Sequence, residues 1–224
     1  ACAIAGVIVG IVSLTGIGLK LADGLLLLSG GIDIFALFLT MIACIILGMG
    51  VPTTANYVIM ATITAPIILK LIPGTPVLAA HMFVFYFGIV ADITPPVALA
   101  AYAGAAISGG NPIRTGVIAT RLAIAAFIIP YMFVLNPAML LIDASILQII
   151  QFICTSMIGM FAISGGMEGF MKKKLPWWQR VLAVGAGLLL IDLGLVTDLI
   201  GIAIIGVVVV LQYVVKEKPK MAEA

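Results

Sequence analysis

A short polar segment between two apolar runs constrains the fold of this chain more than any other feature. Residues 47–57 have the sequence Leu-Gly-Met-Gly-Val-Pro-Thr-Thr-Ala-Asn-Tyr, and they separate the apolar runs 34–46 and 58–69. Each run is shorter than the roughly 20 apolar residues that a membrane-spanning helix needs. Non-helical backbone is tolerated at membrane depth only where protein or a water-filled cavity surrounds it. The pattern therefore predicts a re-entrant hairpin over residues 32–72, with a polar tip at mid-membrane.

Composition supports a membrane environment and argues against several functions. The 224 residues are 64% hydrophobic and 9% charged, whereas soluble domains are about one-quarter charged. This predicts an all-α integral membrane protein. The sequence shows no phosphate-binding loop, no His/Cys metal cluster and no nucleophile–base constellation, so we expect neither an enzyme nor a bound cofactor. It also lacks the basic face that nucleic-acid binding requires.

A second interruption is predicted within the apolar stretch 76–108. The segment Asp92-Ile93-Thr94-Pro95-Pro96 divides this stretch. The two prolines donate no backbone hydrogen bond, and each disfavours helix in the residue before it. We therefore expect two half-helices with an unwound middle, ended by the turn residues 109–112.

The remaining apolar runs predict further membrane segments and their orientation. We expect a span over 2–19, a surface helix over 20–29, and spans over about 113–135, 145–164, 180–195 and 198–215. The basic loop 172–180 and the lysines after Lys216 should be cytoplasmic under the positive-inside rule. The loop 136–143 would then face outward, the hairpin would enter from the outside, and the chain would cross six times.

The two interruptions can supply ion ligands. Unwound carbonyls and half-helix ends coordinate Na⁺ in transporters, and half-helix N-termini face anionic substrate groups. Side-chain oxygens are available from Thr53, Thr54, Asn56 and Thr94, and carbonyls from Gly50 and the neighbours of Pro95. The alternative is that each segment is only a polar turn between packed helices. Two such breaks some forty residues apart favour a shared function.

Several ionisable side chains admit more than one interpretation. Asp92 is an acid within a membrane segment, which is a functional-site hypothesis by default. It could bind a cation or carry a proton, or it could line an aqueous vestibule or pair with Arg121. Arg114 and Arg121 share a helix face, and we expect both to snorkel to the cytoplasmic interface. His81 is interpreted as a packed, hydrogen-bonded residue.

Two motifs give the chain a resemblance to a known family. Residues 48–57 (Gly-Met-Gly-Val-Pro-Thr-Thr-Ala-Asn-Tyr) resemble the second hairpin of the large membrane subunit of TRAP transporters. Residues 81–87 (His-Met-Phe-Val-Phe-Tyr-Phe), with Thr-Pro-Pro-Val-Ala-Leu-Ala-Ala-Tyr at 94–102, resemble the broken helix that follows it. The likeness is greatest to fused permeases of the TAXI subtype, whose extra C-terminal spans are similar to residues 176 onward. The chain starts Ala-Cys-Ala within an apolar run, and we expect it to be the C-terminal part of such a protein.

The resemblance implies an elevator-type secondary transporter of the inner membrane. Residues 1–136 would form the second transport repeat, and residues 137–224 a C-terminal membrane extension. Sodium would drive uptake of a small organic anion, such as a carboxylate, delivered by a periplasmic substrate-binding protein. The other partners would be the N-terminal half and a small membrane subunit. The implied residues are Gly50, Thr53, Thr54, Asn56, Asp92, Thr94 and Pro95 for sodium, and Pro52, Tyr57 and Pro96 for the substrate.

One residue departs from the family pattern and keeps other functions open. Asp92 places an acid where a neutral residue is expected, so proton coupling is an alternative to sodium coupling. A carrier that works without a binding protein is another alternative. A membrane scaffold that does not transport is the alternative from a different class, and it would tolerate loss of the Thr53 and Thr94 hydroxyls.

Overall fold

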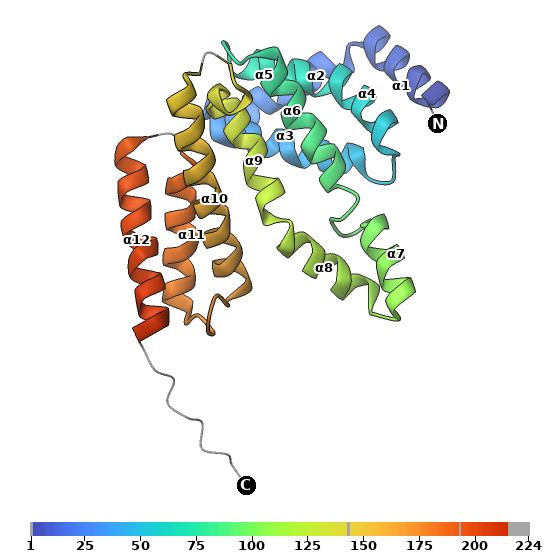
Figure 1. Cartoon of the computed structure of the whole chain (residues 1–224). Coiled ribbons are helices and arrows are strands. Elements are labelled where there is room, and N and C mark those ends of the chain that lie inside the picture. Colours follow the sequence, from blue (N-terminus) through green and yellow to red (C-terminus); the bar gives the residue numbers. More distant parts are fainter. Residues whose placement is uncertain (1, 143, 193, 215–224) are drawn as a thin grey trace. The chain divides into compact units, whose positions relative to one another are not determined.

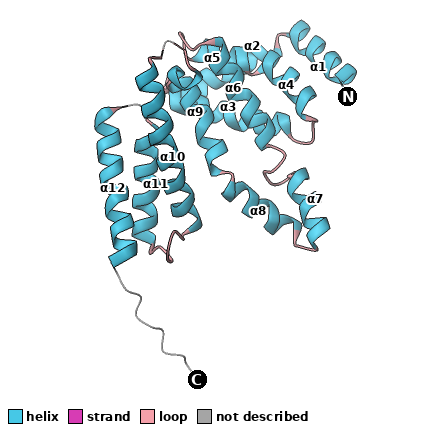
Figure 2. Cartoon of the chain, in the orientation of Figure 1, coloured by secondary structure: helices cyan, strands magenta, loops and turns pink. Residues whose placement is uncertain are grey.

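The computed structural model describes residues 2–142, 144–192 and 194–214. Within these residues every regular element is a helix, and the only β-pairing is an isolated bridge between Phe170 and Lys174 (Figure 2). This confirms the all-α prediction. The chain divides into two compact units, Ala1–Ser145 and Ile146–Ala224, which are treated separately below. Asp143 and the predicted cytoplasmic lysines after Lys216 lie outside the described residues.

The first unit contains α1 to α9 and a short 3₁₀ helix (Figure 1). Its elements are α1 (Cys2–Thr15), α2 (Ile17–Ser29), α3 (Asp33–Gly48), α4 (Thr53–Ile63), α5 (Ala65–Leu71), α6 (Val77–Val90), α7 (Leu99–Ser108), α8 (Pro112–Leu122), α9 (Ile124–Leu135) and η1 (Pro137–Leu140). The first helix is shorter than the span expected over 2–19. It ends because Gly16 adopts the left-handed conformation, with φ of 65°, which a residue without a Cβ enters at little cost.

Helix α6 forms the centre of the first unit. It is apolar on all sides, which is typical of a buried helix, and it contacts α3, α4, α5 and α9. Phe83 and Phe87 are fully buried, and their ring centroids lie 4.8 Å apart. The Tyr131 ring of α9 packs edge-on against both, with centroids at 5.5 and 5.7 Å. Edge-to-face aromatic packing stabilises such a core beyond the area it buries, so α6 is a fixed support for the elements around it.

The helical arms around the polar segment 49–52 differ in length from the prediction. Helices α4 and α5 together form an apolar segment over Thr53–Leu71 of 19 residues, which is long enough to cross a membrane. The sequence indicated a shorter arm because the polar residues at its start were counted with the turn. The re-entrant course of the hairpin stays a prediction.

The other membrane segments partly follow the expected pattern. Among the described residues, Ile146–Glu168 and Leu195–Tyr213 are also long and apolar enough to cross a membrane. The span expected over 113–135 consists of α8 and α9, which meet at 42° and would together count as a fourth crossing helix. These helices agree with an integral membrane protein.

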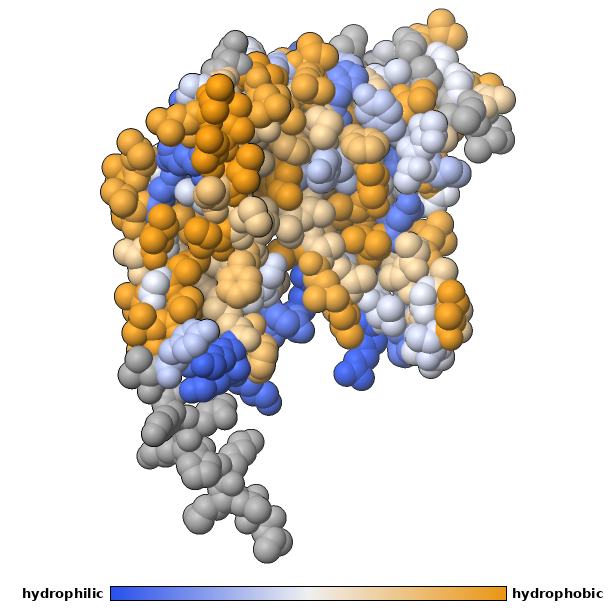
Figure 3. Space-filling model, viewed as in Figure 1, coloured by the Kyte–Doolittle hydropathy of each residue, from blue (hydrophilic) through white to orange (hydrophobic). Residues whose placement is uncertain are grey.

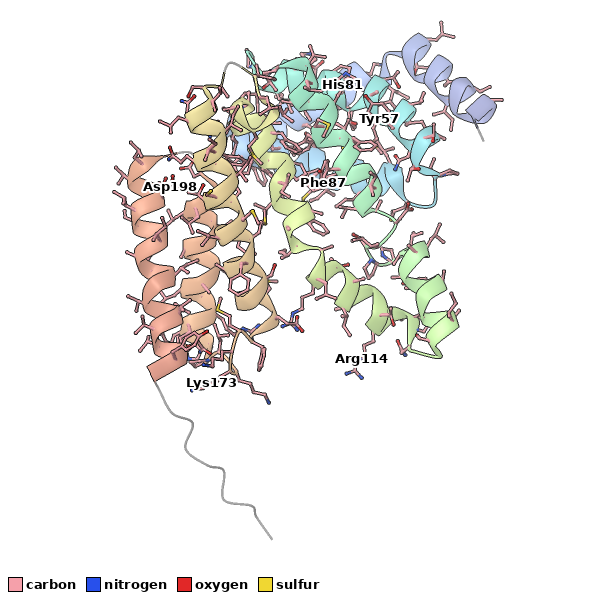
Figure 4. The ribbon with its side chains drawn as sticks, viewed as in Figure 1. Tyr57, His81, Phe87, Arg114, Lys173 and Asp198 are labelled. Carbon is pink, nitrogen blue, oxygen red and sulfur yellow. The ribbon has the colours of Figure 1, made fainter. Side chains whose placement is uncertain are left out.

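The second unit contains α10 (Ile146–Glu168), α11 (Trp177–Ile191) and α12 (Leu195–Val214). Helices α10 and α11 approach closely because each presents a glycine to the other. A Cβ at Gly187 would lie 2.6 Å from the Gly159 carbonyl oxygen, and one at Gly159 would lie 2.8 Å from the Gly187 carbonyl oxygen. Small residues permit this contact between membrane helices. Figure 4 places Asp198 and Lys173 at opposite ends of this unit.

Candidate functional site

The polar segment after α3 forms a tight tip whose backbone is largely open. Gly50 has φ of 76°, a conformation that favours glycine. The Val51 amide donates to the Gly48 carbonyl at 3.4 Å, which closes the turn. Helix α4 then begins at Thr53 with no side-chain cap. Its first amides, up to Ala55, have no acceptor within the described part of the chain. Such an N-terminus carries a partial positive charge and favours anions.

Asn56 joins the tip to the central helix. Its Nδ2 donates to the Gly88 carbonyl oxygen at 2.8 Å, which satisfies one of the last carbonyls of α6. The side chain is 2% exposed and lies between two glycines. A Cβ at Gly48 would lie 2.9 Å from Nδ2, and one at Gly88 would lie 3.0 Å from it. Glycine at both positions therefore makes room for the carboxamide.

The other carboxamide atom of Asn56 is a buried acceptor without a donor. Oδ1 has no hydrogen-bond partner among the described residues. A buried unsatisfied acceptor costs about 1–3 kcal/mol, so such an atom in a native fold requires an explanation. One explanation is a ligand that is held between the tip and α6.

The break between α6 and α7 is present at the predicted place, over residues 91–98. Three neighbours hold its backbone. The Ala100 amide donates to the Asp92 carbonyl at 3.1 Å, Thr120 Oγ1 donates to the Ile93 carbonyl at 3.1 Å, and the Tyr102 hydroxyl donates to the Pro96 carbonyl at 2.8 Å. The break is therefore an ordered structure that α7 and α8 support.

A pocket of about 400 Å³ brings the tip and the break together. Its lining comes from the tip, the break after α6 and the first turn of α7, and consists of Gly50, Val51, Pro52, Asp92, Leu99 and Ala100. The two interruptions, some forty residues apart in the sequence, thus share one surface. The structure brings together three of the predicted site residues here: Gly50, Pro52 and Asp92.

Asp92 is half-buried at this pocket. Its carboxylate forms no hydrogen bond or ion pair with any described residue, so the alternative pairing with Arg121 is not seen. The arrangement agrees with a carboxylate that faces the pocket. Arg114 is exposed on α8, and its amide is capped by the Asn111 side chain.

The other predicted site residues lie beside the pocket rather than on its lining. Thr53 and Thr54 are exposed in the first turn of α4. Thr94 Oγ1 donates to the Val90 carbonyl at 2.7 Å. Pro95 packs towards Gly116 of α8, where a Cβ would lie 3.1 Å from Pro95 Cγ, and Pro96 is exposed.

Tyr57 faces α6. Its hydroxyl lies 3.0 Å from His81 Nδ1, and its ring packs edge-on against Phe85 with centroids 5.5 Å apart. Figure 4 shows Tyr57 and His81 close together on neighbouring helices. The interpretation of His81 as a packed, hydrogen-bonded residue is confirmed. Tyr57 is not part of the pocket lining, and its predicted contact with substrate stays a prediction.

Sequence reasoning missed residues that act through their backbone or their size. Gly88 supplies the carbonyl that holds Asn56, Thr120 holds the break, and Leu99 and Ala100 line the pocket. Gly88 and Thr120 are 32 and 27 residues away from the groups that they contact. The Thr-Pro-Pro segment signalled a break, but no local pattern identified its supports.

Interrupted helices that meet at a pocket in an apolar helical protein are typical of secondary transporters with discontinuous membrane helices. A comparison with known families agrees. The family model of the tripartite ATP-independent periplasmic transporter, DctM component, matches residues 1–148. The chain belongs to this family of large TRAP transporter subunits and is an integral membrane protein. No curated protein and no solved structure matches the chain.

Proposed function

We propose that this chain carries one half of the binding core of a sodium-coupled TRAP transporter in the inner membrane, with an elevator-type mechanism. The imported compound is a small organic anion, a carboxylate, which a periplasmic binding protein delivers. The remaining half of the core and a small membrane subunit complete the complex. The observation that carries the proposal is the pocket at which the open tip, from Gly50 to Pro52, meets the break at Asp92.

The oxygen atoms near this pocket fit a sodium ion. Hard cations take several oxygen ligands from carboxylates, carbonyls and amide side chains. Asn56 Oδ1 is buried without a donor, and the carbonyls of Gly50 and Val51 accept no hydrogen bond from the described residues. The Thr94 hydroxyl donates a hydrogen bond to the Val90 carbonyl, and the lone pairs of its oxygen stay available to a cation. These four residues would hold the ion between the tip and the break.

The start of α4 fits the anionic group of a substrate. Pro52 lines the pocket directly before the uncapped N-terminus of α4. Free amides and the helix dipole together favour a carboxylate at such a position. The cation and the carboxylate would then lie on neighbouring parts of one surface, and each would favour the binding of the other.

Asn56→Leu in the complete transporter tests the sodium site. Loss of one buried ligand, worth about 1–3 kcal/mol, should raise the sodium concentration for half-maximal uptake into proteoliposomes about 5- to 150-fold. Asn136→Leu, at the end of α9, is the matched control and should leave this value unchanged. Normal sodium dependence in a correctly inserted Asn56→Leu protein would remove the tip from the ion site.

Proton coupling through Asp92 is the second candidate. The observation that favours it is a carboxylate that faces the pocket without a partner among the described residues. Such a group can exchange a proton as the pocket opens. Asp92→Asn should then flatten the dependence of uptake on pH at fixed sodium. Superimposable pH profiles, together with equal sodium dependence, would reduce Asp92 to a wall residue of the pocket.

A further inference from the structure

A groove between α10 and α11 lies outside the pocket described above, and it belongs to the second unit. Its volume is about 510 Å³, and its lining is almost entirely apolar except at one end. The lining residues are Gly166, Met167, Trp177, Arg180, Val181, Val184, Gly185 and Leu188. The family match ends at residue 148, before this region.

The length of the groove is close to the thickness of one leaflet of a bilayer's hydrocarbon core. Its α11 wall is a single helix face, since Trp177, Val181, Val184 and Leu188 recur at spacings of three and four residues. From Arg180 to Leu188 the helix rises about 12 Å, at 1.5 Å per residue. Half of the hydrocarbon core of a bilayer is about 15 Å. The groove therefore covers most of one leaflet, from its polar boundary inward.

Positive charge gathers at the end of the groove that Arg180 occupies. The Arg180 guanidinium donates to the Gly166 and Met167 carbonyls at 2.9 Å each, so it is fixed at the end of α10 and lines the groove. The turn between α10 and α11 also carries three consecutive lysines, 172–174, and follows one acid, Glu168, at the end of α10. The lysines lie beyond the lining of the groove, and Lys172 Nζ stands 3.7 Å from the centre of the Tyr213 ring of α12. Figure 3 shows hydrophilic side chains gathered at this end of the unit, where Figure 4 labels Lys173.

The turn that carries these lysines is itself held in place. Gln212 of α12 accepts a hydrogen bond from the Lys173 amide at 3.1 Å and donates one to Gln179 at 2.7 Å. Both glutamines are buried. Trp177, which is exposed, stands at the same end, as interfacial aromatics do in membrane proteins. The turn between α10 and α11 and the first turns of α11 therefore carry the lysines, the aromatic ring and the start of the apolar groove together.

We propose that this groove binds one anionic phospholipid. The headgroup phosphate lies at Arg180 and the lysine turn, and an acyl chain runs along α11 towards Leu188. Basic pockets between membrane helices on the cytoplasmic side are where acidic headgroups bind. The charge at one end and the leaflet-length apolar wall fit a lipid better than a free anion or an apolar peptide. The proposal does not depend on the transport function.

Gly185→Leu tests the acyl-chain part of the site. Gly185 lines the groove, and a Cβ at this position meets nothing within 4 Å, so a larger side chain begins in open space and extends from the groove wall. In purified full chain in detergent, native mass spectrometry should show at least tenfold weaker retention of phosphatidylglycerol. Gly206→Leu, on α12 and also in open space, should retain wild-type binding. Equal lipid retention by both variants and the wild type would overturn the proposal.

Changes in the charge of the lipid headgroup and of the lysine turn test the headgroup part of the site. Phosphatidylglycerol should raise the thermal unfolding temperature more than phosphatidylethanolamine does. Replacing Lys172, Lys173 and Lys174 by Gln should weaken phosphatidylglycerol binding roughly fivefold per lysine near the surface. Inorganic phosphate should not compete. Equal affinity for both lipids, or displacement by phosphate alone, would contradict a phospholipid site.

Discussion

The hairpin tip and the α6–α7 break both interrupt helices at one pocket, yet their backbones differ. At the tip, the amides up to Ala55 and the carbonyls of Gly50 and Val51 have no partner among the described residues. At the break, the carbonyls of Asp92, Ile93 and Pro96 all accept hydrogen bonds from α7 or α8. The tip offers free backbone groups to a ligand, whereas these three carbonyls of the break are already paired, and the break offers a ligand side chains such as Asp92 and Thr94.

This difference suggests a division of roles. Buried backbone groups are almost always paired, so the open groups of the tip are those that a ligand would satisfy. The supported break forms a fixed wall whose first residue, Ala91, lies beside Gly48 at the end of α3. Just before the break, Gly88 of α6 accepts the hydrogen bond from Asn56 of α4. A change at the tip should therefore affect binding, whereas a change at the break should first affect local stability.

The largest effect is expected where the two regions touch. Gly48→Val would push into Asn56 Nδ2, Ala91 Cβ and the Gly88 carbonyl, which lie 2.9, 3.1 and 3.2 Å from the new Cβ position. Overpacking, together with loss of the Asn56 hydrogen bond, should cost about 3 kcal/mol. The measurement is thermal unfolding in detergent. Gly104→Val on α7, in open space, should change stability little; equal losses would mean that the junction is not tightly packed.

A smaller effect is expected at the tip. Gly50→Ala forces a side chain into the left-handed conformation, which costs about 1–2 kcal/mol. Gly74→Ala imposes a similar strain, with φ of 93°, outside the pocket. Both variants should lose similar stability, but only Gly50→Ala should change the sodium dependence of uptake. If both variants, or neither, changed this dependence, the tip would have no special role.

The break should respond locally to loss of its support. Thr120→Val removes the hydrogen bond to the Ile93 carbonyl and should cost about 1 kcal/mol. Hydrogen exchange of residues 91–100 should then become faster. Thr62→Val is the matched control, because its hydroxyl bonds only within α4. Unchanged exchange in Thr120→Val would show that α8 does not support the break.

The smallest change in stability is expected for Thr54→Val. This side chain is exposed, so the free energy of unfolding should change by less than about 0.5 kcal/mol. The Thr54→Val variant instead tests whether the Thr54 hydroxyl binds the ion at the tip. A shift in the sodium concentration for half-maximal uptake would add the Thr54 hydroxyl to the site, and an unchanged value would leave ligation to Asn56 and the backbone.

The sequence by itself determined where the helices are interrupted. Proline and glycine act on their own backbone, so the break at residues 91–98 and the turn at Gly50 could be predicted from local rules. Apolar composition likewise predicted an all-helical membrane protein. The polar residues Thr53 to Asn56 were assigned to the turn, whereas they begin a helix, because an uncapped N-terminus leaves no clear sequence signal.

Only the tertiary structure decided which of these residues share a surface. It placed Asp92 beside Gly50 and Pro52, turned Tyr57 towards His81, and buried Asn56 between two glycines. The physical reason is that most of these contacts join residues 24 to 42 positions apart, and that Asn56 is held by two features, a backbone carbonyl and the absence of a Cβ at its neighbouring glycines. Neither leaves a pattern in the local sequence. A polar residue in a turn can face a ligand or a neighbouring helix, and packing against α6 decides between them.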